Sequence, residues 1–187
     1  MSVRLGILAV LSMGQAYGLQ VHGELESRMN RPGKINVGQI YSTIERLQSR
    51  GLVIKAGSTP DGLPLYEVTA SGRIEVDAWL SFEDVVHSDW GEMVSHVLMA
   101  TSMPGRSALP VVAGYRARFE GVRAEAARIG ELDLPQRRLG ALGDTALAEA
   151  AIRWLDQVST GLGAPAATSH QLVMLRPRRG RRPAGSQ

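Results

Sequence analysis

The chain has 187 residues and no cysteine, which excludes a disulfide framework, a thiol nucleophile and a cysteine-ligated metal site. Hydrophobic residues make up 44% of it and charged residues 21%, a composition typical of a chain that buries a core. The longest apolar stretch, Leu5 to Met13, is far shorter than the roughly 20 residues of a membrane-spanning helix. We therefore expect a cytoplasmic protein with no membrane partner.

The positive charge is concentrated near the C-terminal end. The net charge is +3 and the isoelectric point about 9.7. Residues 176–187 contain five arginines and no acidic residue, whereas residues 1–80 carry 8 basic and 7 acidic side chains and residues 81–175 carry 8 and 11. Because the body of the chain is nearly neutral, a prediction of nucleic-acid binding must depend on motifs. The tail would add at most salt-dependent, sequence-independent affinity for DNA.

The first eighty residues predict three helices followed by a hairpin. An apolar helix spans 3–12, and a second helix spans 17–29 with one apolar face. A third begins near Val37, after Asn36 as a plausible N-cap. Its apolar stripe consists of Ile40, Ile44 and Leu47. Strands at 52–54 and 65–68 flank a turn over 56–64, in which Gly62 can take a positive φ. This order is that of a winged helix-turn-helix, and a further helix runs from Thr69 to Leu80.

The third helix and the hairpin carry a family motif. Residues 38–53 read Gly-Gln-Ile-Tyr-Ser-Thr-Ile-Glu-Arg-Leu-Gln-Ser-Arg-Gly-Leu-Val, and residues 66–73 read Tyr-Glu-Val-Thr-Ala-Ser-Gly-Arg. With the Tyr17-Gly18 pair, they resemble the PadR family of transcriptional regulators over most of residues 3–80. Gln39 stands where that family usually has Ser or Thr, and Ser42 where Pro is frequent. The resemblance implies a DNA-binding regulator with a helical dimerisation region, and the departures imply a different operator.

The polar face of the third helix carries side chains of the types that recognise bases in DNA. Amides, hydroxyls and guanidinium groups recognise base edges in the major groove, which admits one helix. The candidates for base contacts are Gln39, Ser42, Thr43 and Arg46. The candidates for phosphate contacts are Lys34, Asn36, Tyr41, Arg50 and Lys55. The alternative interpretation of this face is a solvated amphipathic helix with no ligand.

The second half predicts helices of a different kind. One contains Trp90 and ends at Met103-Pro104. In the next, apolar residues recur in a heptad seam. The seam consists of Val112, Tyr115, Phe119, Val122, Ala126 and Ile129. We predict a linker over 133–143 and a last helix from Asp144, and we expect the seam and this helix to pack against their counterparts in a two-fold dimer.

Other chemistry finds little support in the sequence. The pairs Glu83/His87 and Glu92/His96 have helical i, i+4 spacing but no metal-site signature, so we interpret them as helix-surface residues. No phosphate-binding loop or nucleophile motif is present, and we expect neither an enzyme nor a cofactor. Trp90 and Met93 have two interpretations. They pack in a core or a dimer interface, or, as the resemblance implies, they contact a small hydrophobic or aromatic effector.

The sequence thus predicts a mainly α fold with a small β-hairpin wing. Its expected parts are a winged helix-turn-helix over 1–80, a helical dimerisation and effector region over 81–160, and a flexible arginine-rich tail over 161–187. The expected function is transcriptional repression by a homodimer on a pseudo-palindromic double-stranded operator, relieved by an effector. The alternative is a winged-helix module that acts through protein–protein contact, with DNA binding lost or secondary.

Overall fold

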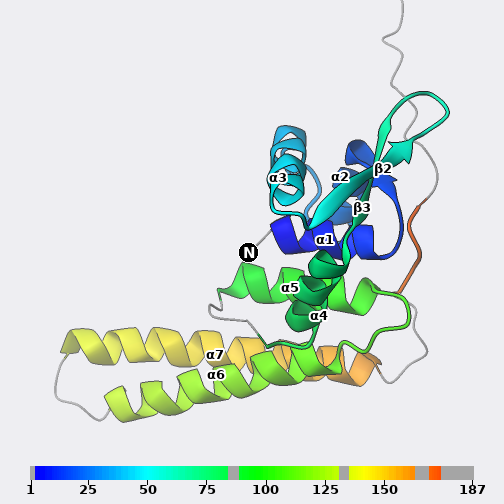
Figure 1. Ribbon diagram of the computed structural model, residues 1–187. Helices are drawn as coiled ribbons and strands as arrows, with labels where there is room; N and C mark the ends of the chain where they lie inside the picture. Colours follow the sequence, from blue (N-terminus) through cyan, green and yellow to red (C-terminus); the bar gives the residue numbers. More distant parts are fainter. Residues whose placement is uncertain (1–2, 84–88, 131–134, 163–168, 174–187) are drawn as a thin grey trace, which may run out of the picture.

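The computed structural model describes residues 3–83, 89–130, 135–162 and 169–173. A winged helix lies at one side of the molecule, a long antiparallel helix pair lies at the other, and α5 lies between them (Figure 1). The winged helix contains α1 (Val3–Ser12), α2 (Gly18–Arg28), α3 (Val37–Ser49) and α4 (Ala70–Leu80). The other helices are α5 (Trp90–Ser102), α6 (Leu109–Gly130) and α7 (Pro135–Leu162). The predicted fold class is confirmed.

The wing is a three-stranded antiparallel sheet in the order β1-β3-β2. β2 (Val53–Ser58) and β3 (Pro64–Val68) form the predicted hairpin, and Gly62 has the expected positive φ, +82°. β2 extends beyond the predicted end at Ile54: pairing continues past an irregularity between Lys55 and Gly57 to Ser58 opposite Pro64. β1 (Ala16–Tyr17), which was not predicted, pairs with β3, so Tyr17 belongs to a strand and not to the predicted helix 17–29.

The core of the winged helix fixes the orientation of α3. Residues 7–11 of α1 are completely buried, and α2, α3 and α4 all contact α1. The predicted apolar stripe of α3, namely Ile40, Ile44 and Leu47, is at most 1% exposed. Because this stripe faces inward, the opposite face of α3 is left towards solvent.

Two predictions for the α6–α7 pair are wrong. Residues 135–143, predicted as linker, are the first turns of α7, and Asp144 lies inside the helix instead of capping it. Proline suits the first helical position because the N–H it lacks would have no intrahelical acceptor there. The seam residues Tyr115, Phe119 and Ala126 are buried, and α6 packs along α7 of the same chain. The rest of the predicted linker, residues 133–134, lies outside the described residues.

The C-terminal region also differs from the prediction. Residues 161–162 belong to α7, and residues 169–173, which we call the strap, lie against α2 through several hydrogen bonds. The other residues of the predicted tail lie outside the described ranges. Among the helices that the structure describes, none combines the length and apolar character needed to cross a bilayer.

Gly72 shows how closely α4 approaches the hairpin. A Cβ at this position would lie 2.4 Å from the backbone oxygen of Leu52 and 2.6 Å from Cγ2 of Val68. Gly23, in α2, has no atom within 4 Å of the corresponding position. The two glycines therefore form a matched pair of helical sites, one crowded and one open.

We predict that Gly72→Ala lowers the free energy of unfolding by roughly 1–3 kcal/mol, because a backbone carbonyl must move to admit the methyl group. Gly23→Ala should raise it by about 0.5–1 kcal/mol, since alanine favours the helix. Urea unfolding followed by circular dichroism measures both. Equal effects of the two substitutions would contradict the described packing of α4 on the hairpin.

Candidate nucleic-acid interface

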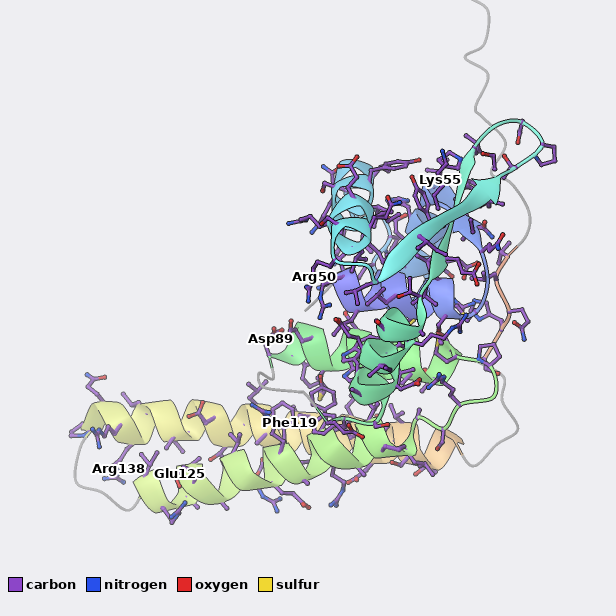
Figure 2. All side chains as sticks on the ribbon, viewed as in Figure 1. Arg50, Lys55, Asp89, Phe119, Glu125 and Arg138 are labelled. Atoms are coloured by element: carbon purple, nitrogen blue, oxygen red, sulfur yellow. The ribbon has the colours of Figure 1, made fainter. Side chains whose placement is uncertain are left out.

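The N-terminus of α3 is fixed by the predicted cap. The Oδ1 of Asn36 accepts a hydrogen bond from the backbone N–H of Gly38 at 2.7 Å. This bond satisfies one of the free N–H groups of the first turn and leaves the side-chain amide of Asn36 as a donor. Arg50 lies at the other end of α3 and Lys55 on β2, while Glu125 and Arg138 lie at the far end of the α6–α7 pair (Figure 2).

Three of the four candidates for base contacts are exposed on α3: Gln39, Ser42 and Arg46. The Arg46 guanidinium lies back along its own helix, with Nε donating to the Ser42 carbonyl and Nη2 to Thr43 Oγ1, both at 3.2 Å. Ser42 Oγ donates to the carbonyl of Gln39 at 3.2 Å. These are long, local bonds, so the side chains can turn outward at small cost.

Thr43 lies elsewhere than predicted. Its side chain is 6% exposed, so it belongs to the inner half of α3 and not to the polar face. Position 43 follows Ile40 by three residues and precedes Leu47 by four, which places it beside the buried stripe. Its hydroxyl accepts from Arg46 and could act on DNA only by orienting that guanidinium.

The candidates for phosphate contacts are all exposed but differ in their surroundings. Lys34 and Lys55 make no ion pair with any residue in the described ranges. Arg50 Nη2 lies 3.7 Å from Glu75 Oε1, and Arg4 contacts the other oxygen of Glu75. Since such exposed pairs are weak, Arg50 can exchange this carboxylate for a phosphate.

Tyr41 and an unpredicted acidic residue lie where α3 approaches the wing. Tyr41 is 39% exposed, and its ring covers Gly18 of α2. Burial raises the pKa of Tyr66, on β3, and the nearby Tyr41 and Glu45 raise it further. Glu45 therefore faces the wing, where it would repel a phosphate at that edge. Its position on the wing side of α3 could not be inferred from helical spacing alone.

A capped helix with an exposed polar face lies beside a hairpin wing in this structure, and the comparison with known protein families agrees with that arrangement. Residues 7–78 match the model of the transcriptional regulator PadR-like family. These residues, which we call the PadR-like domain, are therefore similar to that family. The match includes α3 and the wing and ends within α4, so the resemblance inferred from the sequence motifs is confirmed there.

Among curated proteins, none matches this chain. Matching solved structures include Bacillus subtilis PadR in complex with operator DNA, at 14% identity over 85% of this chain and 98% of that one, with a TM-score of 0.38. The Vibrio cholerae virulence activator AphA matches at 21% identity over 87% and 99%, also with a TM-score of 0.38. Bacillus subtilis PadR in complex with p-coumaric acid matches at 14% identity over 86% and 98%, with a TM-score of 0.38.

The two candidates for effector contacts lie outside the PadR-like domain and differ from each other. Trp90 is 39% exposed at the start of α5, and its ring centroid lies 6.0 Å from that of Trp154 on α7. Met93 is completely buried, so a ligand cannot touch it in this conformation. Trp90 therefore remains the accessible member of the pair.

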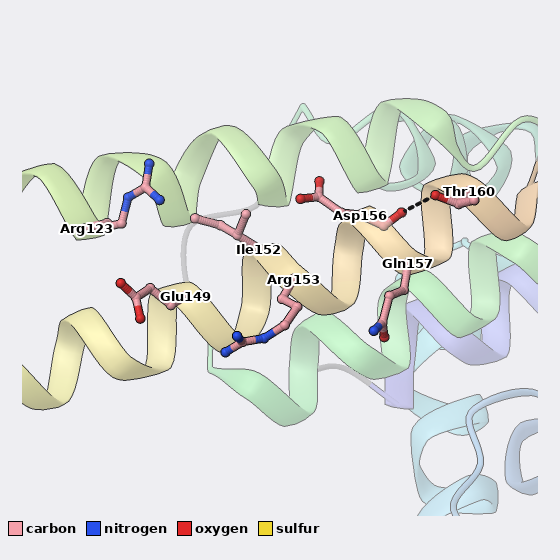
Figure 3. A pocket seen from close by; sticks show the side chains of 7 residues that line it. All are labelled: Arg123, Glu149, Ile152, Arg153, Asp156, Gln157 and Thr160. Atoms are coloured by element: carbon pink, nitrogen blue, oxygen red, sulfur yellow. Dashed lines mark hydrogen bonds between the residues drawn. The ribbon is translucent and has the colours of Figure 1, made fainter.

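The groove between α6 and α7 does not suit an apolar ligand (Figure 3). It has a volume of about 490 Å³ and is lined mainly by charged and polar side chains, including Arg123, Glu149, Arg153 and Asp156. Arg116 Nε donates to Asp156 Oδ1 at 2.8 Å nearby. Neither Trp90 nor Met93 lines this groove.

His96, interpreted from the sequence as a helix-surface residue, is instead buried and joins the PadR-like domain to the helices that follow it. His87 lies outside the described residues. His96, on α5, is 1% exposed and stacks on Trp79 of α4 with ring centroids 4.1 Å apart. Its Nδ1 lies 3.2 Å from the hydroxyl of Tyr115 on α6. Burial lowers the pKa of His96 to about 3, against a smaller opposing effect of the Trp79 backbone. The imidazole is therefore neutral where it holds α4, α5 and α6 together.

We predict that His96 makes stability fall with acidification. The pKa of His96 is about 3 in the folded chain and 6.5 without the burial effect, so the unfolded chain binds this proton first as the pH falls. The resulting loss should approach about 1.4 kcal/mol per pH unit between pH 6 and 4. Urea unfolding of His96→Phe at both pH values should show a correspondingly smaller loss. Identical losses in the variant and the unmodified chain would contradict a buried neutral imidazole.

Proposed function

We propose that this protein is a DNA-binding transcriptional regulator in which α3 enters the major groove. The observation that carries the proposal is the exposed polar face of α3, with Gln39, Ser42 and Arg46 opposite a stripe that is at most 1% exposed. These groups are donors and acceptors of the kind that read base edges. The PadR-like match over residues 7–78 supports a regulator of transcription.

Basic and polar groups around α3 support contact with the phosphate backbone. Lys34 and Asn36 precede the first turn of α3, Arg50 follows its last turn, and Lys55 extends from β2. Contacts of this kind fix the register of a protein on the duplex without reading its sequence. The tip of the wing, residues 59–63, has no basic side chain and should contribute little.

A homodimer would place two such helices on one pseudo-palindromic operator. Leu139 and Leu142 are 63% and 67% exposed in the first turns of α7, and Leu147 is 42% exposed farther along. Exposed leucines on a projecting helix are candidates for contact with a second copy, whereas the seam of α6 is already used within the chain. Two-fold symmetry would then bring the recognition helices about 34 Å apart.

The last part of the proposal is that the protein represses transcription and that a small hydrophobic or aromatic effector relieves this repression. The half-exposed Trp90 beside Trp154 is the support for an aromatic ligand, since flat apolar walls suit such molecules. An effector bound there could act only by favouring one arrangement of α5 and α7 over another. Titration of Trp fluorescence with aromatic acids, together with release of DNA, tests this part.

We predict that Arg46→Ala weakens binding to the selected operator by about 1–3 kcal/mol and relaxes the preference at the bases it contacts. Lys34→Ala should weaken binding to all duplexes alike and reduce the salt slope by about 1. Fluorescence anisotropy with operator and scrambled duplexes at several salt concentrations measures both effects.

Arg128→Ala is the matched control, because it removes the same charge from an exposed site near the far end of α6. It should leave operator preference unchanged. Operator binding by Arg46→Ala that equals that of the unmodified chain would contradict a reading role for α3. Absence of duplex binding by the unmodified chain would favour a protein–protein module instead.

A further inference from the structure

The turn between α2 and α3 is held by two side chains of α2. Glu26 Oε1 accepts a hydrogen bond from the backbone N–H of Gly33 at 2.7 Å. One helical turn earlier, His22 Nε2 donates to the carbonyl of Ile35, also at 2.7 Å. The Glu26 and His22 side chains are 22% and 15% exposed, and His22 Nε2 lies 3.8 Å from Glu26 Oε1. We call these two hydrogen bonds the clasp.

The residue between the two positions that the clasp holds is Lys34. Its side chain is exposed, and it is one of the candidates for phosphate contacts. Its backbone N–H donates to the carbonyl of Arg31 at 3.1 Å, and the next residue, Ile35, is 6% exposed in the core. Gly33 has a φ of +66°, a conformation that favours glycine. The backbone of Lys34 is therefore held on both sides, while its side chain stays exposed to solvent.

The acidic side chain of the clasp has two opposite effects on a phosphate contact at Lys34. A carboxylate near the duplex repels phosphate, so the charge of Glu26 by itself weakens binding. The same carboxylate holds the N–H of Gly33, and a charged acceptor forms a stronger hydrogen bond than a neutral one. A backbone residue that is mobile before binding must be ordered on binding, which lowers affinity by roughly fivefold to thirtyfold. The clasp removes part of this cost in advance.

We propose that Glu26 and His22 are positioning residues for DNA binding, which preorganise the backbone of Lys34 for a phosphate contact beside the first turn of α3. The inference rests on the proposed function and deepens it, because it gives a role to two residues that need not touch the duplex. The clasp acts through Lys34, since α3 itself is oriented by its buried stripe and by the cap at Asn36.

A comparison of Glu26→Ala with Glu26→Gln separates the clasp from the charge. Both variants lack the carboxylate, but glutamine keeps an oxygen at Oε1 that can accept from the N–H of Gly33. Glu26→Gln should bind any duplex at least as tightly as the unmodified chain, because the repulsion of phosphate is removed. Glu26→Ala should bind about twofold to tenfold more weakly than Glu26→Gln, as expected for one lost hydrogen bond. Fluorescence anisotropy at constant salt measures both affinities.

The corresponding comparison at His22 tests the other hydrogen bond of the clasp. His22→Gln keeps a nitrogen donor, Nε2, at the same number of bonds from Cα, whereas His22→Leu removes the donor. His22→Leu should bind duplexes about twofold to tenfold more weakly than His22→Gln. This pair replaces the first one if circular dichroism shows that Glu26→Ala disturbs the fold.

Lys34→Ala provides a measurement that a purely structural role would not change. In a chain with Lys34→Ala, the Glu26→Ala and Glu26→Gln variants should bind alike, because the side chain that the clasp positions is absent. A clasp that only stabilises the fold would give the same difference with and without Lys34. Glu45 is the matched control, since it is an exposed acid of α3 that accepts no hydrogen bond within the described ranges. Glu45→Ala and Glu45→Gln should bind equally well.

Three outcomes separate this inference from the proposed function. A chain that prefers its operator, but in which Glu26→Ala and Glu26→Gln bind equally, overturns the clasp alone. A difference that depends on Lys34 and appears on all duplexes, without any operator preference, supports the clasp but contradicts the reading role of α3. Absence of duplex binding by the unmodified chain overturns the proposed function and, with it, the role of the clasp.

Discussion

The buried Glu24–Arg28 pair connects three parts of the chain that are distant in sequence. Arg28 Nη1 donates to the carbonyl and the hydroxyl of Ser102 at the end of α5, at 2.7 and 3.1 Å. Nη2 holds the strap, and Nε holds Glu24. A guanidinium has five donors in a fixed fork, and here all of its nitrogen atoms are used. Removing either partner would leave a buried charge uncompensated, at a cost of about 3–5 kcal/mol.

This connection makes the position of α3 depend on more than the winged helix. α2 packs against α3, and Arg28 links α2 to α5 and to the strap. His96 adds a second link, since it joins α5 to α4 and α6. Packed contacts thus run from α5 through Arg28 to α2 and α3, and regulation by a ligand near Trp90, as proposed above, would need a continuous connection of this kind.

The winged helix could be predicted from sequence because its signals are local. The cap at Asn36, the stripe of Ile40, Ile44 and Leu47, and the turn at Gly62 are each specified within a few residues, and the structure has all of them. Thr43 was misplaced because its hydroxyl suggested the polar face, although its spacing of three residues from Ile40 and four from Leu47 places it beside the buried stripe. β1 was missed because two residues carry no strand periodicity of their own.

The parts that could not be predicted depend on contacts between distant residues. Proline and glycines over 135–143 suggested a linker, yet packing against α6 extends α7 through them. The heptad seam indicated that α6 packs against other helices, but not that these are α5 and α7 of the same chain. The strap has no periodic pattern, and residues far away in the sequence hold it: Gln20, Glu24 and Arg28 of α2, and the Ser102 carbonyl at the end of α5.

Selection of bound duplexes from a random pool, followed by footprinting of the enriched sequence, tests the central claim most directly. The account predicts two inverted half-sites about one helical turn apart, with protection of the major groove in each. It also predicts that Arg46→Ala loses that enrichment. A pool that yields no enriched sequence, or one that Arg46→Ala enriches equally well, would contradict a reading role for α3.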